Sequence, residues 1–334
     1  MGFKIEQGEK FALLAFSGLT IGFDDQTPNP ADLGFSCWAS GKLPFSLDAW
    51  WREQLGKIVS EQLENRCNFV LATKRRATSS ETFGEESQAL NRQVQFLFQG
   101  LAVSAGVPTF ELGRLIYGTT VEPNHPNRPK IAVGQFERFH RTKGMSGPVA
   151  DLAALRSAAC FSHHLEKLFE IFGRDSMSHH RLSSGIDALR TGFSARLAHT
   201  RLHQFVRAIE ACLPAEQVWG ASDFADYAAT FLSRPEEQDT RLMLLQMYKL
   251  RNVAEHHRRF DRRALADVAD PEIVAIRRTR QVEVFAREIY RRFLGTEVNH
   301  LPVFQSDDTL EEFWSDKDRV RNTWGSPLDL SSIS

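Results

Sequence analysis

The chain has 334 residues, of which 42% are hydrophobic and 25% are charged. This composition is typical of a folded globular protein and excludes wholesale disorder and fibrous repeats. The 41 lysines and arginines nearly balance the 42 aspartates and glutamates, for a net charge of -1, so any electrostatic attraction to nucleic acid or to a membrane has to be local.

The length suits two domains and a tail. For residues 1–150 we expect an α+β domain, because strand and helix patterns alternate there. Helical spacing of apolar residues predicts helices at 46–66, with Ser46 as the candidate N-cap, and at 88–105. Strands are predicted within the apolar segment 11–23, as a strand or hairpin, and at 68–73, 115–117 and 131–133.

Residues 151–295 have the pattern of one helix after another. Apolar residues recur with a period near 3.6, and Gly and Pro cluster in the gaps, which predicts an all-α bundle of at least four helices without strands. A predominantly helical protein follows. The expected helices lie at 149–172, 183–213 (one or two), 223–232, 235–260 and 271–294.

Residues 296–334 hold eight acidic and three basic residues and no long periodic segment. We expect them to form a loosely packed acidic C-terminal tail. The preceding segment, 241–295, has the opposite character, with thirteen basic and seven acidic residues and a net charge of +6.

Signals of export are lacking in the sequence. Residues 1–10 lack the basic patch and long apolar core of a signal peptide, and no run of about 18 apolar residues occurs. The cysteines form no closely spaced pairs, which indicates buried thiols in a reducing compartment. We expect a cytoplasmic protein with no membrane partner. The four cysteines are Cys37, Cys67, Cys160 and Cys212.

Arginines outnumber lysines in the basic segment, and arginine favours bidentate recognition of phosphate. One interpretation is a phosphate-binding surface for RNA, and the other is a set of solvated helix faces. The candidate RNA-binding residues are Arg258, Arg259, Arg262 and Arg263.

The motif with the clearest chemical meaning lies just before those arginines. Arg251, Asn252 and His256 form the pattern R-N-x3-H, and His257 extends it. Asn252 and His256 are four residues apart and share one helix face, whereas Arg251 lies about 140° around the helix from His256. Two such helices, brought together antiparallel, would complete one site.

These residue types are sufficient for cleavage of RNA without a metal. RNA supplies its own nucleophile, the 2′-hydroxyl, so a histidine for proton transfer and a cation for the developing phosphorane charge complete the requirements. The alternative is that Arg251 only forms a surface ion pair with Glu255, four residues on. Exposure of that pair, or burial of His256 in the core, would argue against catalysis.

No other cofactor or metal site is indicated. Ser40-Gly41-Lys42 lacks the glycine-rich loop that binds nucleotide phosphates, and no G-x-G-x-x-G follows a strand. His199 and His203 have the spacing of metal ligands but no accompanying carboxylate, so we interpret them as surface histidines.

The helical region resembles the HEPN superfamily, and particularly its Apea-like branch. Its segments "AIE" at 208–210, "YKLRN" at 248–252 and "IYRRFL" at 289–294 carry the resemblance, which covers roughly residues 185–295. The resemblance implies a metal-independent endoribonuclease of phage defence or toxin systems, with its active site shared across a homodimer.

The resemblance also implies roles for particular residues. Arg251 and His256 take the catalytic places, Asn252 the polar place beside the arginine, and Glu210 the acidic place of the first helix, while His257 is an alternative to His256. RNA is then the substrate, and residues 1–150 sense a trigger or bind a regulatory partner. Since many members of the family lack nuclease activity, the alternative function is a non-catalytic dimerisation or nucleic-acid-binding module.

Overall fold

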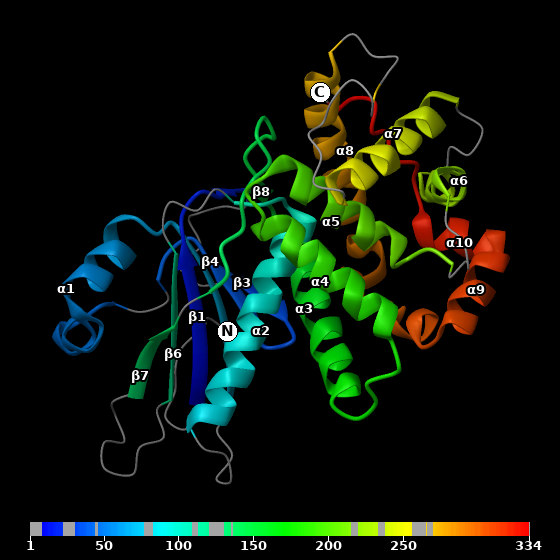
Figure 1. Cartoon of the computed structure of the whole chain (residues 1–334). Helices are drawn as coiled ribbons and strands as arrows, with labels where there is room; N and C mark the ends of the chain where they lie inside the picture. Colours follow the sequence, from blue (N-terminus) through cyan, green and yellow to red (C-terminus); the bar gives the residue numbers. More distant parts are fainter. Residues whose placement is uncertain are drawn as a thin grey trace. The chain divides into compact units, whose positions relative to one another are not determined.

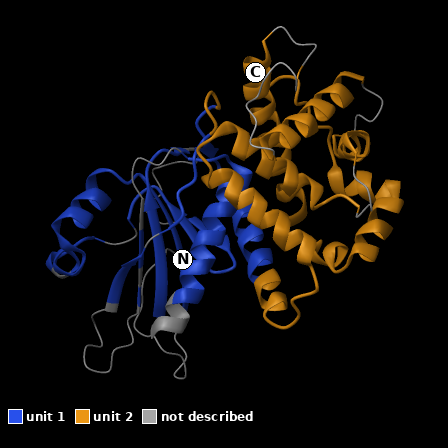
Figure 2. Cartoon of the chain, in the orientation of Figure 1, with its two compact units in different colours: residues 1–141, 146–166 blue, residues 142–145, 167–334 orange. Residues whose placement is uncertain are grey.

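The computed structural model describes residues 9–22, 31–43, 46–76, 83–108, 113–119, 130–134, 136–214, 220–232, 238–255, 265 and 270–333. Within these ranges the chain forms ten α-helices and eight strands, a mixed α+β protein that is predominantly helical (Figure 1). It divides into two compact units, residues 1–141 with 146–166 and residues 142–145 with 167–334 (Figure 2).

Unit 1 contains a six-stranded sheet in which every neighbouring pair of strands is antiparallel. A separate two-stranded parallel sheet joins β2 (Thr20–Ile21) to β8 (Val149–Ala150). The strand order of the main sheet is β3 (Ala31–Gly34), β4 (Cys37–Ser40), β5 (Phe69–Arg76), β1 (Glu9–Phe16), β6 (Gly113–Thr119) and β7 (Lys130–Gly134).

The central strand β1 is apolar along almost its whole length because both faces of the sheet are covered (Figure 1). Phe11 of β1 lies in one core cluster with Trp51 of α1 (Ala49–Asn65). On the opposite face, Phe16 contacts Phe98 of α2 (Phe83–Ser104), with ring centroids 5.5 Å apart. The predicted strand in segment 11–23 is confirmed, but β2 pairs with β8 and not with β1, so no hairpin forms.

Helix α1 (Ala49–Asn65) differs from the predicted helix at 46–66 in two ways. Its N-cap is Asp48, whose side chain accepts a hydrogen bond from the Trp51 amide at 3.0 Å, and not Ser46. The helix is also interrupted at Gly56, where φ is 75° and ψ is 160°. Glycine adopts this positive φ without the steric cost that other residues meet, so two helical segments replace one continuous helix.

Unit 2 is helical, as predicted. Within the described parts of 151–295 the structure has six helices and no strand. No helix in the described ranges combines the length and apolarity needed to cross a membrane. The helices are α3 (Leu152–Phe172), whose last residues belong to unit 2, α4 (His180–Ser194), α5 (Ala198–Glu210), α6 (Ala221–Phe231), α7 (Gln238–Glu255) and α8 (Pro271–Leu294).

Helix α5 packs against α4, α7 and α8. Glycine in α4 permits the close approach: a Cβ atom at Gly192 would lie 2.6 Å from the Phe205 ring, and one at Gly185 would collide with Tyr290 of α8. The buried Tyr290 hydroxyl donates a hydrogen bond to the Ala208 carbonyl at 2.9 Å. These contacts lock α5 between its neighbours.

A buried ion pair joins α5 to α8. The Arg201 Nη2 lies 2.9 Å from Glu283 Oε2, and the two side chains are 3% and 1% exposed. Arg201 also donates hydrogen bonds to the Phe193 and Ala195 carbonyls, at 3.2 and 3.0 Å, and to the Thr142 hydroxyl, at 2.8 Å. Because its donors are satisfied, the buried charge of Arg201 is tolerated.

The expectation of a loosely packed tail at 296–334 is wrong. The segment forms a 3-10 turn (Leu301–Phe304) and two helices, α9 (Asp307–Ser315) and α10 (Lys317–Trp324). Trp324 stacks on Phe231 with ring centroids 3.8 Å apart, and Trp314 donates a hydrogen bond to the Cys212 carbonyl at 3.0 Å. The acidic residues within the two helices are exposed, while the aromatic residues complete the core of unit 2.

The C-terminal segment should therefore contribute to the stability of unit 2. Trp324 is 2% exposed, so Trp324→Ala should lower the free energy of unfolding by about 3–5 kcal/mol, as measured by urea denaturation. Asn322→Ala, at an exposed position of the same helix, is the matched control and should change it by less than about 0.5 kcal/mol. Equal stability of the two variants would contradict this account of the segment.

Candidate functional site

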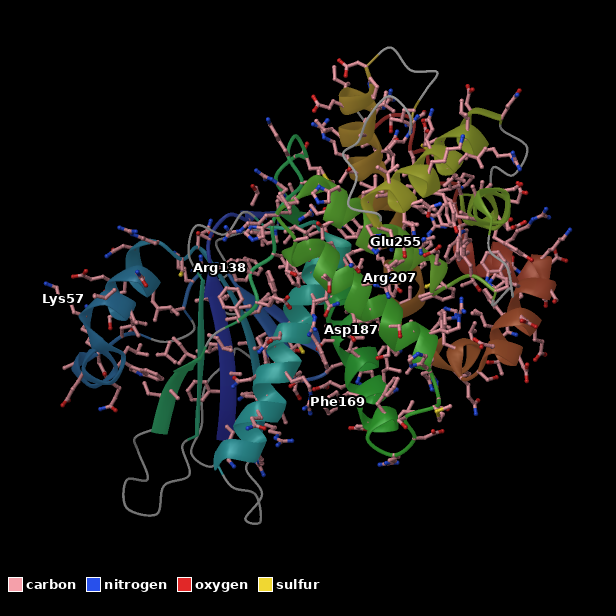
Figure 3. All side chains as sticks on the ribbon, viewed as in Figure 1. Lys57, Arg138, Phe169, Asp187, Arg207 and Glu255 are labelled. Carbon is pink, nitrogen blue, oxygen red and sulfur yellow. The ribbon has the colours of Figure 1, made fainter. Side chains whose placement is uncertain are left out.

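Polar side chains gather where α5 meets α7. On each helix three of them recur at intervals of three and four residues, which places them on one face of that helix. Arg207 and Glu255, one from each helix, are labelled in Figure 3. The two sets are His203, Arg207 and Glu210 on α5, and Tyr248, Arg251 and Glu255 on α7.

Arg251 is the centre of this group. Its Nη2 lies 3.5 Å from Glu210 Oε2, and its Nη1 lies 2.6 Å from Glu255 Oε2 and 3.0 Å from Asn252 Oδ1. The structure thus brings together Arg251, Asn252 and Glu210. The pair with Glu255, which the sequence offers as the alternative, also forms. The Arg251 side chain is 19% exposed and the Glu255 side chain 48% exposed, so the pair joins a largely buried guanidinium to an exposed carboxylate.

Two of the five N–H groups of the Arg251 guanidinium form no hydrogen bond with a described residue. Of its five N–H groups, three make the hydrogen bonds to Asn252, Glu255 and Glu210. Nε is buried and has no hydrogen-bond partner among the described residues. The guanidinium also lies 5.6 Å from the centre of the Tyr248 ring, a cation–π contact that orients it.

Burial perturbs the acidic group on α5. It raises the pKa of Glu210, and the guanidinium groups of Arg251 and Arg207 oppose that rise. Burial likewise raises the pKa of Tyr248. Perturbed groups beside a cavity are characteristic of functional sites, although structural ion pairs produce them too.

His203 is one of the site residues that the sequence analysis missed, together with Arg181, Arg207 and Tyr248. It is half-buried beside Arg251, and burial lowers its pKa, a shift that its hydrogen bond to the Arg251 backbone opposes. The interpretation of His203 as a surface histidine is therefore wrong. The available signal was its spacing of seven residues from Glu210, which puts both on one face of α5.

A cavity of about 410 Å³ adjoins Arg251 between α4, α5 and α7. Arg181 of α4 closes one side of it, donating hydrogen bonds to the Glu210 and Leu213 carbonyls at 3.0 and 2.8 Å. These carbonyls end α5, where a cation is favourable. The lining consists of His180, Arg181, Ser184, Arg207, Glu210, Ala211, Tyr248 and Arg251.

Several predicted site residues lie outside the described residues. They are both candidate catalytic histidines, His256 and His257, and the four candidate RNA-binding residues, Arg258, Arg259, Arg262 and Arg263. Among the residues with described positions, no group of three or more histidine, cysteine or carboxylate side chains is arranged to hold a metal ion.

Comparison of the chain with family models, with curated proteins and with solved structures gives no significant match. The resemblance of residues 185–295 to the HEPN superfamily therefore rests on the residues of this chain alone.

The burial of His203 predicts a pH dependence of stability. Its pKa in the folded protein is lower than the ordinary value of 6.5, so the unfolded chain takes up the proton more readily. Stability present above about pH 6.5 is then lost as the pH falls through the lower, folded-state pKa. In urea denaturation across this range, His203→Gln should lose stability less steeply than the unaltered protein. Parallel curves for the two proteins would show that His203 makes no such contribution.

Proposed function

We propose that this protein is a metal-independent endoribonuclease of HEPN type that acts as a homodimer. The observation that supports the proposal best is the environment of Arg251. Its guanidinium is largely buried, is held between two helices by Glu210 and Glu255, and adjoins a cavity of about 410 Å³ lined by two more arginines. A preorganised cation beside a cavity suits the negative charge that develops in phosphoryl transfer.

The proposed reaction uses the nucleophile that RNA carries. A histidine removes the proton of a 2′-hydroxyl, whose oxygen attacks the adjacent phosphorus, and the bond from phosphorus to the 5′-oxygen breaks. The protonated histidine gives its proton to the departing 5′-oxygen, leaving a 2′,3′-cyclic phosphate and a 5′-hydroxyl. Arg251 stabilises the phosphorane, Asn252 and Glu210 position Arg251, and His256 transfers protons, with His257 as its alternative.

The dimer follows from helix geometry. Arg251 and His256 are separated by about 140° around a straight helix, so they cannot converge on one phosphate from a single helix. In a two-fold dimer, Arg251 of one subunit can meet His256 of its partner, since an isologous interface uses the same patch twice. We place Asn252 at or beside that interface.

A second function, a non-catalytic dimerisation or nucleic-acid-binding module, is favoured by the pairing of Arg251. At 2.6 Å from Glu255 and 3.5 Å from Glu210, its charge is balanced within the subunit. A structural ion-pair network of this kind needs no catalytic role.

We place the proposed nuclease in the cytoplasm, in phage defence or a toxin system. The α+β part of the chain, residues 1–150, would then sense a trigger or bind a regulatory partner that restrains cleavage.

Cleavage of total RNA and tRNA in EDTA tests the proposal. Arg251→Ala and His256→Ala should each lower the rate by about 10²- to 10⁴-fold with the far-UV circular dichroism unchanged, because each removes charge stabilisation or proton transfer. His257→Ala should be milder. Lys249→Ala, at an exposed position of α7, is the matched control and should cleave normally.

The products should end in 2′,3′-cyclic phosphate. Cleavage that requires added magnesium, or that persists undiminished in the Arg251 and His256 variants, would contradict the proposed mechanism. Binding of RNA without cleavage by the unaltered protein would leave the non-catalytic module as the better account.

A further inference from the structure

The cavity beside Arg251 brings together cations from α4, α5 and α7. Three arginines from three different helices line it, Arg181 from α4, Arg207 from α5 and Arg251 from α7, against a single carboxylate, Glu210. Glu210 itself is engaged by Arg251. Outside the lining, Glu255 pairs with Arg251 and Asp307 lies near Arg181, so the positive charge left to attract an anion is that of Arg207.

The three arginines differ in how far their charges are already balanced. Arg251 pairs with Glu210 and Glu255. Arg181 binds two carbonyls, and its Nε lies 3.6 Å from Asp307. The side chain of Arg207 forms no hydrogen bond or ion pair with any described residue, and it is exposed. Arg207 is therefore the cation in this lining that is best placed to bind an external group.

Two further side chains of the lining can donate hydrogen bonds to an anion. Ser184 supplies a hydroxyl and His180 a ring N–H, and both can add hydrogen bonds to an anion that Arg207 holds in bidentate fashion. The volume of about 410 Å³ lies toward the small end of the range for ligand sites, about 300–1,000 Å³. Such a site suits one splayed-out nucleotide better than the side of a duplex.

We propose that this cavity is a subsite for a phosphodiester group of single-stranded RNA, adjacent to the phosphate that Arg251 contacts. Arg207 is its main ligand, with Ser184 and His180 as further donors. The proposal rests on the proposed function in taking RNA as the ligand. It differs from that function in concerning binding alone, through residues of α4 and α5 that take no part in the chemistry.

Salt dependence of binding tests the subsite directly. The probe is a short fluorescein-labelled 2′-O-methyl oligonucleotide, which lacks the nucleophile and stays intact, and fluorescence anisotropy gives its affinity. Each phosphate contact on a single strand contributes about 0.7 to the slope of log K against log salt concentration. Arg207→Ala should weaken binding and reduce the slope by about 0.7, whereas Arg207→Lys should keep the slope.

Arg196→Ala is the matched control, because Arg196 is exposed and lies outside the cavity lining, so its slope should equal that of the unaltered protein. An Arg207→Ala slope equal to that of Arg196→Ala would overturn the subsite. The subsite would also be overturned if Arg207→Ala weakened the binding of a polyglutamate peptide but not that of the RNA probe. That result would indicate an acidic protein partner.

The outcomes separate this inference from the proposed function. If Arg207→Ala binds the probe normally while Arg251→Ala abolishes cleavage, the subsite is wrong and the nuclease stands. If no RNA is cleaved but Arg207→Ala lowers the slope, the subsite stands and the nuclease is wrong.

Discussion

The burial of Arg251 is the constraint on which the arrangement of the site depends. A guanidinium that is only 19% exposed has to be paired, because an uncompensated buried charge costs several kcal/mol. Glu255 on its own helix and Glu210 on α5 provide the pairing. The second contact links α5 to α7 at the site, where His203 lies against the Arg251 backbone and Arg207 lines the cavity.

Much of the fold could be predicted from the sequence, because long segments with a clear pattern of apolar residues predict their secondary structure. The helices of unit 2 and the apolar strand β1 are of this kind. The kink at Gly56 could not be predicted, since a glycine within a helical pattern is compatible with a straight helix. The ordered structure of residues 296–334 could not be predicted either. Its two helices, of 9 and 8 residues, are too short to show a clear period. Their stability comes from aromatic contacts with residues distant in sequence, such as Phe231.

The site was predicted in part, for a related reason. Arg251 and Asn252 are adjacent in sequence, and Glu210 ends the short segment AIE on which the resemblance depends. Short sequence patterns could therefore identify all three residues. The contribution of His203 depends on which face of α5 meets α7. That face is selected by tertiary packing, in which Arg201, two residues earlier, is buried against Glu283 of α8. The clustering of Arg181 with Arg207 likewise joins residues of two helices that no short motif connects.

The central claim, that Arg251 of one subunit acts with His256 of its partner, is tested most directly by mixing two inactive variants. Arg251→Ala and His256→Ala subunits, unfolded together and refolded, should form mixed dimers in which one of the two sites is intact. With random pairing, about a quarter of all sites are complete, so the account predicts recovery of about a quarter of the unaltered protein's cleavage rate, while each variant alone stays inactive. A mixture as inactive as its components, although mixed dimers form, would contradict a site shared between subunits.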